Sequence, residues 1–343
     1  MAATIKQVAE IAGVSKATVS RVLNDSKPVR PETRERVLQA IKALDFQPNS
    51  TARSLVFKKS RTIGVVITDI ANLFVSVLVK GIEKIAFNHG YNIIICNSHG
   101  SAEKEIELLL MLHNKQVDGI VFLTSRLKKE HKSFLREASV PISLVNVSYD
   151  ESNLVGIRID NSKAAYDITS YFLKKGFTRV GMIRAPLEDQ YTGQERFDGY
   201  RQALQDHGVP FNEDFVKTGT LDARDGYRIG REIIKENLNL EALFVACDLM
   251  AFGTMKAIFD QGLKIPDDIE VAGFDDVPMS SYYHPSLTTV RQPIDKMGRL
   301  AAEMVINLIE GKKIDQWEIV LPHEIVLRDS TAKDAYKPLP TPE

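Results

Sequence analysis

The stretch that most constrains the fold of this chain covers residues 5–24, IKQVAEIAGVSKATVSRVLN. It predicts a first helix, because apolar residues recur at the spacing of one helical face: Ile5, Val8, Ala9 and Ala12. Thr4 can cap this helix and Gly13 can end it. Ser15 then caps a second short helix whose inward side chains are Val19 and Val22. Two helices joined by so tight a turn form a compact helical pair.

The outward face of the second helix carries Lys16, Ala17, Ser20 and Arg21. Short side chains on this face let a helix approach base edges in the major groove of DNA. Lysine and arginine can donate hydrogen bonds to guanine or to phosphates. We therefore predict a DNA-binding helix-turn-helix. The alternative is a three-helix subdomain that binds no DNA.

Residues 31–46, PETRERVLQAIKALDF, predict a third helix, with Pro31 in its first turn and a buried stripe of Val37, Ala40, Ile41 and Leu44. The following residues 47–55, QPNSTARSL, are too few for a stable isolated helix, and we expect them to order on DNA. Residues 1–60 hold eleven Lys/Arg and five Asp/Glu in a chain whose formal net charge is −1. A basic head on an acidic body indicates a polyanionic partner for the head alone.

Few residues in the remaining chain indicate catalytic or metal chemistry. Cys96 and Cys247 lie in apolar runs and are expected to be buried thiols. The seven histidines are dispersed without metal-ligand spacing, and the common hydrolase, phosphate-loop and dinucleotide motifs are missing. We expect no cofactor, no metal, no catalytic residue and no membrane span, and so a soluble, cytoplasmic protein that is not an enzyme.

Beyond residue 61 the pattern changes to short apolar runs alternating with amphipathic helices. The first set of β-rich runs covers residues 62–68, 91–97, 119–123 and 142–147, with helices expected at 75–88, 102–115 and 129–138. A second set covers 179–183, 215–219, 242–246 and 269–275. The predicted fold class is α/β, with two similar lobes of parallel sheet covered by helices on both faces.

In such sheets a ligand binds beyond the carboxyl ends of the strands, in the crevice between lobes. The candidates at those positions are Asp69, Asn72, Phe74, Asn146, Arg196, Asp248 and Asp275. A guanidinium donates to neighbouring hydroxyls and a carboxylate accepts from them, which suits a polyol. Two alternatives stay open: Asp248 caps the helix expected at 249–261, and Arg196 with Asp275 forms a structural ion pair.

The order of these parts resembles the lactose-repressor/galactose-repressor (LacI/GalR) family of bacterial transcription regulators over nearly the whole chain. The motifs that carry the resemblance are VAEIAGVSKATVSRVLN, RVLQAIKALDFQPNSTARSL, GFDD and HPSLTTVRQP. The resemblance implies a homodimer on a pseudo-palindromic operator, with Leu55 entering the minor groove. The DNA-binding residues are then Thr4, Ser15, Lys16, Ala17, Thr18, Ser20, Arg21, Asn24, Asn49, Ala52, Arg53 and Leu55.

The resemblance also implies a domain organisation with a two-lobed core like the type I periplasmic binding proteins. The headpiece covers 1–46 and a hinge 47–60. The first lobe covers 61–160 with 290–322, the second 161–289 with 323–330, and a polar tail 331–343. The tail lacks the leucine heptads of tetramers.

Matched to the family, Arg196 and Asp275 hydrogen-bond an effector, and Leu221 joins the effector-binding set. We expect a repressor of a sugar-utilisation operon. One alternative is a catabolite-control regulator with a phosphorylated phosphocarrier protein as corepressor. That branch has a tyrosine–aspartate pair and an arginine where this chain has Asp295, Lys296 and Glu303, and Glu303 would repel a phosphoserine. A purine effector is the other alternative, although Leu73 and Leu221 replace aromatics that would stack on a base.

Overall fold

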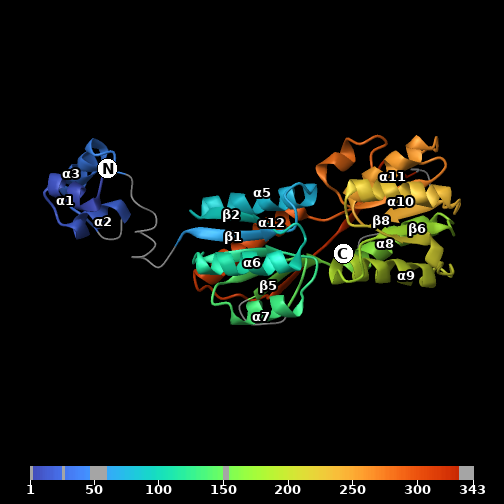
Figure 1. Ribbon diagram of the computed structural model, residues 1–343, viewed down its shortest axis with the longest axis horizontal. Helices are drawn as coiled ribbons and strands as arrows, with labels where there is room; N and C mark the ends of the chain where they lie inside the picture. Colours follow the sequence, from blue (N-terminus) through green and yellow to red (C-terminus); the bar gives the residue numbers. More distant parts are fainter. Residues whose placement is uncertain (1–2, 25–27, 47–59, 150–153, 332–343) are drawn as a thin grey trace, which may run out of the picture. The chain divides into compact units, whose positions relative to one another are not determined.

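A computed structural model describes residues 3–24, 28–46, 60–149 and 154–331. The chain forms two compact units, Met1–Arg61 and Thr62–Glu343 (Figure 1). Each unit has a hydrophobic core of its own.

The first unit contains three helices, α1 (Ile5–Ala12), α2 (Lys16–Asn24) and α3 (Pro31–Ala43). The predicted caps of the first two are confirmed. The Thr4 hydroxyl accepts from Gln7 N, Gly13 has a left-handed φ of 63°, and Thr18 N donates to Ser15 Oγ at 3.2 Å. The third helix is three residues shorter than predicted because Asp45 takes a left-handed φ of 45°. The core between them is made by Val8, Ala9, Ala12, Val19, Val22, Val37 and Ala40.

The second unit contains two lobes of α/β structure, as predicted. In the first lobe the sheet order is β11-β5-β4-β3-β1-β2, and every neighbouring pair is parallel. Its elements are β1 (Thr62–Ile67), α5 (Leu73–Asn88), β2 (Asn92–Asn97), α6 (Ala102–Asn114), β3 (Gly119–Leu123), α7 (Lys129–Glu137), β4 (Ile142–Val145), β5 (Leu154–Ile159), α12 (Ile294–Ile309) and β11 (Glu318–Leu321). Helices α5 and α12 pack together on one face of the sheet, and α6 and α7 cover the other (Figure 1).

In the second lobe the sheet order is β12-β10-β9-β8-β6-β7. Its elements are α8 (Asn161–Lys174), β6 (Val180–Arg184), η1 (Gln190–Glu195), α9 (Arg196–Asp206), η2 (Glu213–Phe215), β7 (Val216–Thr218), α10 (Ala223–Lys235), β8 (Ala242–Val245), α11 (Asp248–Asp260), β9 (Glu270–Asp275), η3 (Pro278–Ser281), β10 (Thr288–Arg291) and β12 (Glu324–Val326). Helices α8 and α9 lie on one side, and α10 and α11 on the other (Figure 1). The edge strand β12 is antiparallel to β10, whereas a wholly parallel sheet was predicted.

Three connections join the lobes: β5 to α8, β10 to α12, and β11 to β12. Strands β5, β10 and β11 were not predicted from the sequence. Strand β5 carries a glycine and an arginine, and strand β10 is mostly polar, so neither of these two strands presents a continuous apolar run. Partners on both sides supply the pairing for β5 and β10 that their own residues do not specify.

Helices α5 and α12 touch backbone to backbone. A methyl group at Gly298 would lie 2.2 Å from Leu78 O, and one at Gly81 would lie 2.5 Å from Asp295 O. These two glycines therefore set the spacing of the helix pair that covers one face of the first sheet.

We predict that Gly298→Ala lowers the free energy of unfolding by about 1–3 kcal/mol, because the added methyl group must push α12 away from α5. The measurement is urea denaturation of the full chain. Lys296→Ala, at an exposed position of the same helix, is the control and should change stability by less than about 0.5 kcal/mol. Equal urea midpoints for Gly298→Ala and wild type would contradict this prediction, because they would show that α12 can move away from α5 without a loss of stability.

Candidate functional site

The exposed face of α2 carries the side chains predicted to contact DNA bases. Lys16, Ala17 and Arg21 are exposed, while Val19 and Val22 on the opposite face are buried. The buried pair anchors the helix against the core of the first unit, so the exposed face is presented outward by packing rather than by a loop.

The remaining predicted DNA-binding residues occupy varied positions. Thr4 and Ser15 are exposed, and their hydroxyls serve as helix caps. Thr18 and Ser20 are half-buried, and Asn24 ends α2. The other four lie outside the residues that the structure describes: Asn49, Ala52, Arg53 and Leu55.

The second unit holds a cleft of about 810 Å³ between its two lobes. It lies where the strands of both sheets reach their carboxyl ends, as expected for α/β sheets. Seven of the eight predicted effector-binding residues line it: Asp69, Asn72, Phe74, Asn146, Arg196, Leu221 and Asp275. Side chains that follow separate strands in the sequence are thus brought around one space.

Arg196 is the first residue of α9, and its guanidinium is held on three sides. The group stacks on the Phe274 ring at 3.5 Å from the ring centroid. Its Nε donates to Asn161 Oδ1 at 2.9 Å, and its Nη1 donates to Ala246 O. Burial lowers the pKa of Arg196, and the nearby charge of Asp275 opposes this shift. The remaining N–H groups of the guanidinium are available to donate to a hydroxyl in the cleft.

Asp275 ends β9 beside this arginine. Gln292 Nε2 donates to its Oδ1 at 2.7 Å. Burial raises the pKa of Asp275, and both the Arg196 charge and the Gln292 hydrogen bond oppose that shift. The carboxylate therefore has one committed oxygen and keeps acceptor capacity for a ligand.

Asp248 is not among the residues that line the cleft, which separates it from the other predicted effector contacts, and the prediction that it caps α11 is wrong. Its side chain is fully buried, and the N-cap of α11 is Cys247. Its Oδ2 accepts from Val277 N at 2.9 Å and from Ser280 Oγ at 2.7 Å, while its Oδ1 accepts from Thr289 Oγ1 at 2.6 Å. Three donors from the loop after β9 and from β10 draw the carboxylate inward. Its role is to position these segments.

The cleft also contains residues that the sequence analysis did not single out, namely His99, Arg126, Asp189, Thr192, Asp222, Arg224 and Gln292. Arg126 follows β3 in the first lobe, and its Nε lies 4.0 Å from Asp189 Oδ1 in the second. Burial raises the pKa of Asp189, against a hydrogen bond from Ser125 and the Arg126 charge. Arg126 follows β3 and Asp189 follows β6, so the rule that ligands bind beyond strand ends could have found both residues from the sequence.

Four of the lining residues have left-handed backbones although none is glycine, and one of them is His99 with a φ of 54°. The φ angles of the other three are 67° at Asn146, 63° at Leu221 and 123° at Asp275. Such conformations cost roughly 1–3 kcal/mol each and concentrate at ligand sites. Their position around one cleft supports its assignment as the functional site of this unit.

Within residues 3–24, 28–46, 60–149 and 154–331, no group of three His, Cys, Asp or Glu side chains is arranged to hold a metal ion. None of the helices in this part of the chain is long and apolar enough to cross a membrane. Cys96 and Cys247 are both buried free thiols, as predicted, and burial raises the pKa of each.

Known proteins resemble both units. Residues 4–49 match the model for bacterial regulatory proteins of the lacI family, and residues 169–331 match that for periplasmic binding protein-like domains. The HTH-type transcriptional regulator RegA of Clostridium acetobutylicum is 39% identical over 96% of this chain and 99% of its own. The lac repressor dimer bound to operator and the anti-inducer ONPF matches with a TM-score of 0.87, at 27% identity over 97% of this chain and 100% of its own. A complex of the transcriptional regulator CelR with cellobiose matches with a TM-score of 0.72, at 29% identity over 96% of this chain and 99% of its own.

We predict that Asp248→Ala lowers the free energy of unfolding by about 1–3 kcal/mol, because three buried donors lose their acceptor. Thermal unfolding of the full chain measures this. Asp267→Ala removes an exposed carboxylate from the same lobe and serves as the control. A loss of ligand binding without any loss of stability would instead make Asp248 a ligand-contacting residue.

Proposed function

Because this chain belongs to the lacI family of bacterial regulatory proteins, we propose that it represses a sugar-utilisation operon. In this proposal α2 contacts the bases of an operator, and a sugar bound in the cleft controls operator affinity. The observation that carries the effector assignment is the arrangement of Arg196 and Asp275 in one buried wall of the cleft. The Arg196 guanidinium is a donor and the Asp275 carboxylate is an acceptor, and hydrogen bonds to the protein hold each of them in place.

The charges of the cleft favour a neutral polyhydroxylated ligand. Its lining has three arginines, Arg126, Arg196 and Arg224, and four aspartates, Asp69, Asp189, Asp222 and Asp275. Mixed donors and acceptors of nearly balanced charge match the alternating hydroxyls of a sugar better than a phosphate or a carboxylate. Phe74 adds an apolar surface on which a sugar ring can pack. CelR, which resembles this chain, is described as a complex with cellobiose.

Operator recognition requires two copies of the chain in this proposal. One helix-turn-helix covers about half of an operator, and a two-fold dimer matches a pseudo-palindrome. The lac repressor resembling this chain is a dimer bound to its operator. The basic residues of the first unit would make affinity fall steeply with salt.

The two alternative effectors are less well supported. A phosphorylated phosphocarrier protein docking on α12 would meet the exposed carboxylate of Glu303, while Arg299 there is paired with Asp295 at 2.8 Å. A purine could stack on Phe74 but would find no aromatic side chain at Leu221, which also lines the cleft. Thermal-shift measurements with sugars, nucleobases and sugar phosphates separate these ligand classes, because a bound ligand stabilises the fold.

Lys16→Ala and Arg21→Ala should each weaken binding to the specific operator by about 1–3 kcal/mol, because each removes a donor to a base edge. Gel-shift titrations on operator and on random-sequence DNA measure the effect. Lys42→Ala, which removes an exposed charge from α3, is the matched control. Equal losses on both DNAs would assign Lys16 and Arg21 to phosphate contacts instead.

Asp275→Asn should abolish the sugar response and leave operator binding intact, because it keeps the shape of the side chain while removing the charged acceptor. Coupling between effector and operator of about 1–3 kcal/mol is typical, so a response lost in the variant is measurable. Operator titrations with and without the sugar found by thermal shift measure it, with Asp267→Asn as control. A sugar response of Asp275→Asn at the wild-type concentration would contradict the assigned effector site. Loss of operator binding by the folded variant would contradict it as well.

A further inference from the structure

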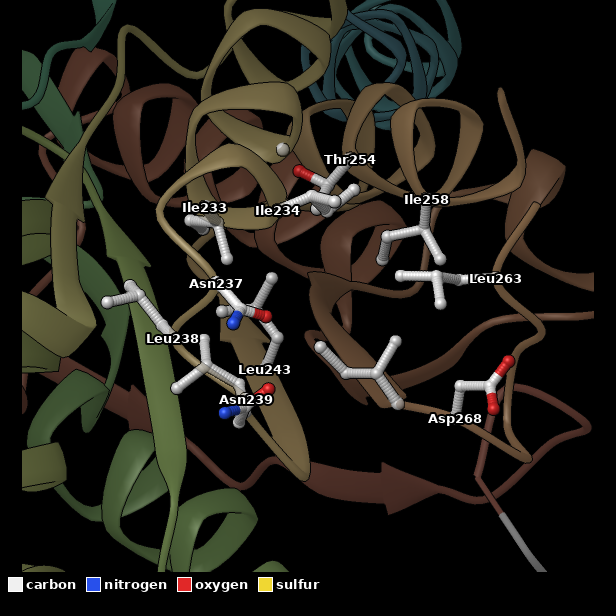
Figure 2. Close-up of a pocket in the computed structure, with 13 residues that line it drawn as sticks. Ile233, Ile234, Asn237, Leu238, Asn239, Leu243, Thr254, Ile258, Leu263 and Asp268 are labelled. Carbon is white, nitrogen blue, oxygen red and sulfur yellow. The ribbon is translucent and has the colours of Figure 1, made fainter. Parts of the chain in front are cut away.

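A second cavity lies in the second lobe, apart from the cleft. It has a volume of about 190 Å³ and lies between the C-terminal parts of α10 and α11 and strand β8. Figure 2 shows side chains of Ile233, Leu243, Ile258 and Leu263 arranged around this space. Three of them are almost fully buried, with exposed fractions of 5% for Ile233, 1% for Leu243 and 2% for Ile258. The interior of the cavity is therefore apolar.

The cavity is large enough for one small ring. An apolar cavity of about 150 Å³ stays dry and takes up benzene, because water finds no hydrogen-bonding partners there. The space in this protein exceeds that volume. The apolar side chains around this space lack van der Waals contacts on the side that faces it. A fitting apolar molecule would restore those contacts.

The rim of the cavity is polar and carries no positive charge among the described lining residues. Asn237 and Asn239 are exposed at the rim, and each amide offers both a donor and an acceptor. The only charged lining residue that the structure describes there is Asp268, whose Oδ2 accepts from Lys264 N at 2.7 Å. Arg179 lies beside this rim, where its Nε donates to Asn239 O at 2.8 Å. The rim therefore offers hydrogen bonds to a hydroxyl or N–H group of a neutral ligand, while the apolar interior disfavours a charged one.

Helices α10 and α11 connect this cavity with the cleft. The chain at the start of α10 contributes Leu221 and Ala223 to the cleft, and the start of α11 contributes Leu249. Between the two sites the helices touch backbone to backbone: a methyl group at Gly253 would lie 1.9 Å from Ala223 O. Thr254, on the cavity wall, donates its hydroxyl to Gly226 O of α10 at 3.1 Å. Close-packed elements transmit a displacement from one end to the other.

We propose that this cavity is a second ligand site, which takes an uncharged ring-sized molecule with one hydroxyl or N–H group, such as a phenol or an indole. Its occupation shifts the starts of α10 and α11 in the cleft wall. Regulation of the repressor through this site rests on the proposed function, but binding and the helix shift do not.

The test uses p-cresol and the full chain labelled at isoleucine and leucine methyl groups. We expect saturable NMR shifts at Ile233, Ile258 and Leu263, with smaller saturable shifts at Leu221 and Leu249. The anion 4-methylbenzoate has a ring of the same size and should give none of them. No saturable shift at the cavity methyls up to the solubility of p-cresol would overturn the site. Cavity shifts without shifts at Leu221 and Leu249 would overturn the connection to the cleft.

A cavity-filling variant checks the location. Ile234→Phe should abolish the p-cresol shifts at both sets of methyls while retaining a dispersed methyl spectrum. The same substitution at half-buried Ile106 in the first lobe should retain the shifts. Leu238→Phe, at the rim, is the second filling variant and should give the same result if Ile234→Phe does not fold. Undiminished p-cresol shifts in a folded filling variant would place the ligand elsewhere. A sugar screen without any hit would count against the proposed effector and leave this result unchanged.

Discussion

The second lobe is organised around a buried arginine and a buried carboxylate that share one wall of the cleft. Burial lowers the pKa of Arg196 and raises that of Asp275, and each charge opposes the shift of the other. Removing two charges from water costs several kilocalories per mole, and only well-placed hydrogen bonds offset this cost. Asn161, Ala246 and Gln292 supply some of these bonds. In the proposed function, sugar hydroxyls in the cleft would supply more of them.

The position of Asp275 depends in turn on Asp248. The buried Asp248 carboxylate binds the backbone of Val277 and the hydroxyls of Ser280 and Thr289, and so ties the loop after β9 to β10. Gly273 leaves room for it, because a methyl group there would lie 2.3 Å from Asp248 Oδ1. This network holds the left-handed backbone of Asp275 in place. Asp248, which does not line the cleft, therefore helps to fix the position of the Asp275 carboxylate in the cleft wall.

Each lobe of the second unit contains one pair of helices in close backbone contact. In the first lobe α5 and α12 meet through glycines, and in the second α10 and α11 do the same. Helices in backbone contact cannot slide or separate gradually without losing many contacts, so each pair moves as one body. Since α10 and α11 both begin at the cleft, a ligand there acts on the whole helix pair rather than on a single loop.

The sequence by itself determined much of this protein. Apolar periodicity, Thr4, Gly13 and Ser15 specify the helix-turn-helix, because capping and hydrophobic patterning act over a few residues. The alternation of β-rich runs and helices specifies the α/β class, and the rule of strand ends located six residues of the cleft. Only the tertiary structure decided which way each of these side chains turns. Asp248 points inward because donors about 30 to 40 residues away capture it, and Arg126 meets Asp189 because two lobes face each other. Such contacts depend on distant parts of the chain, and no local pattern records them.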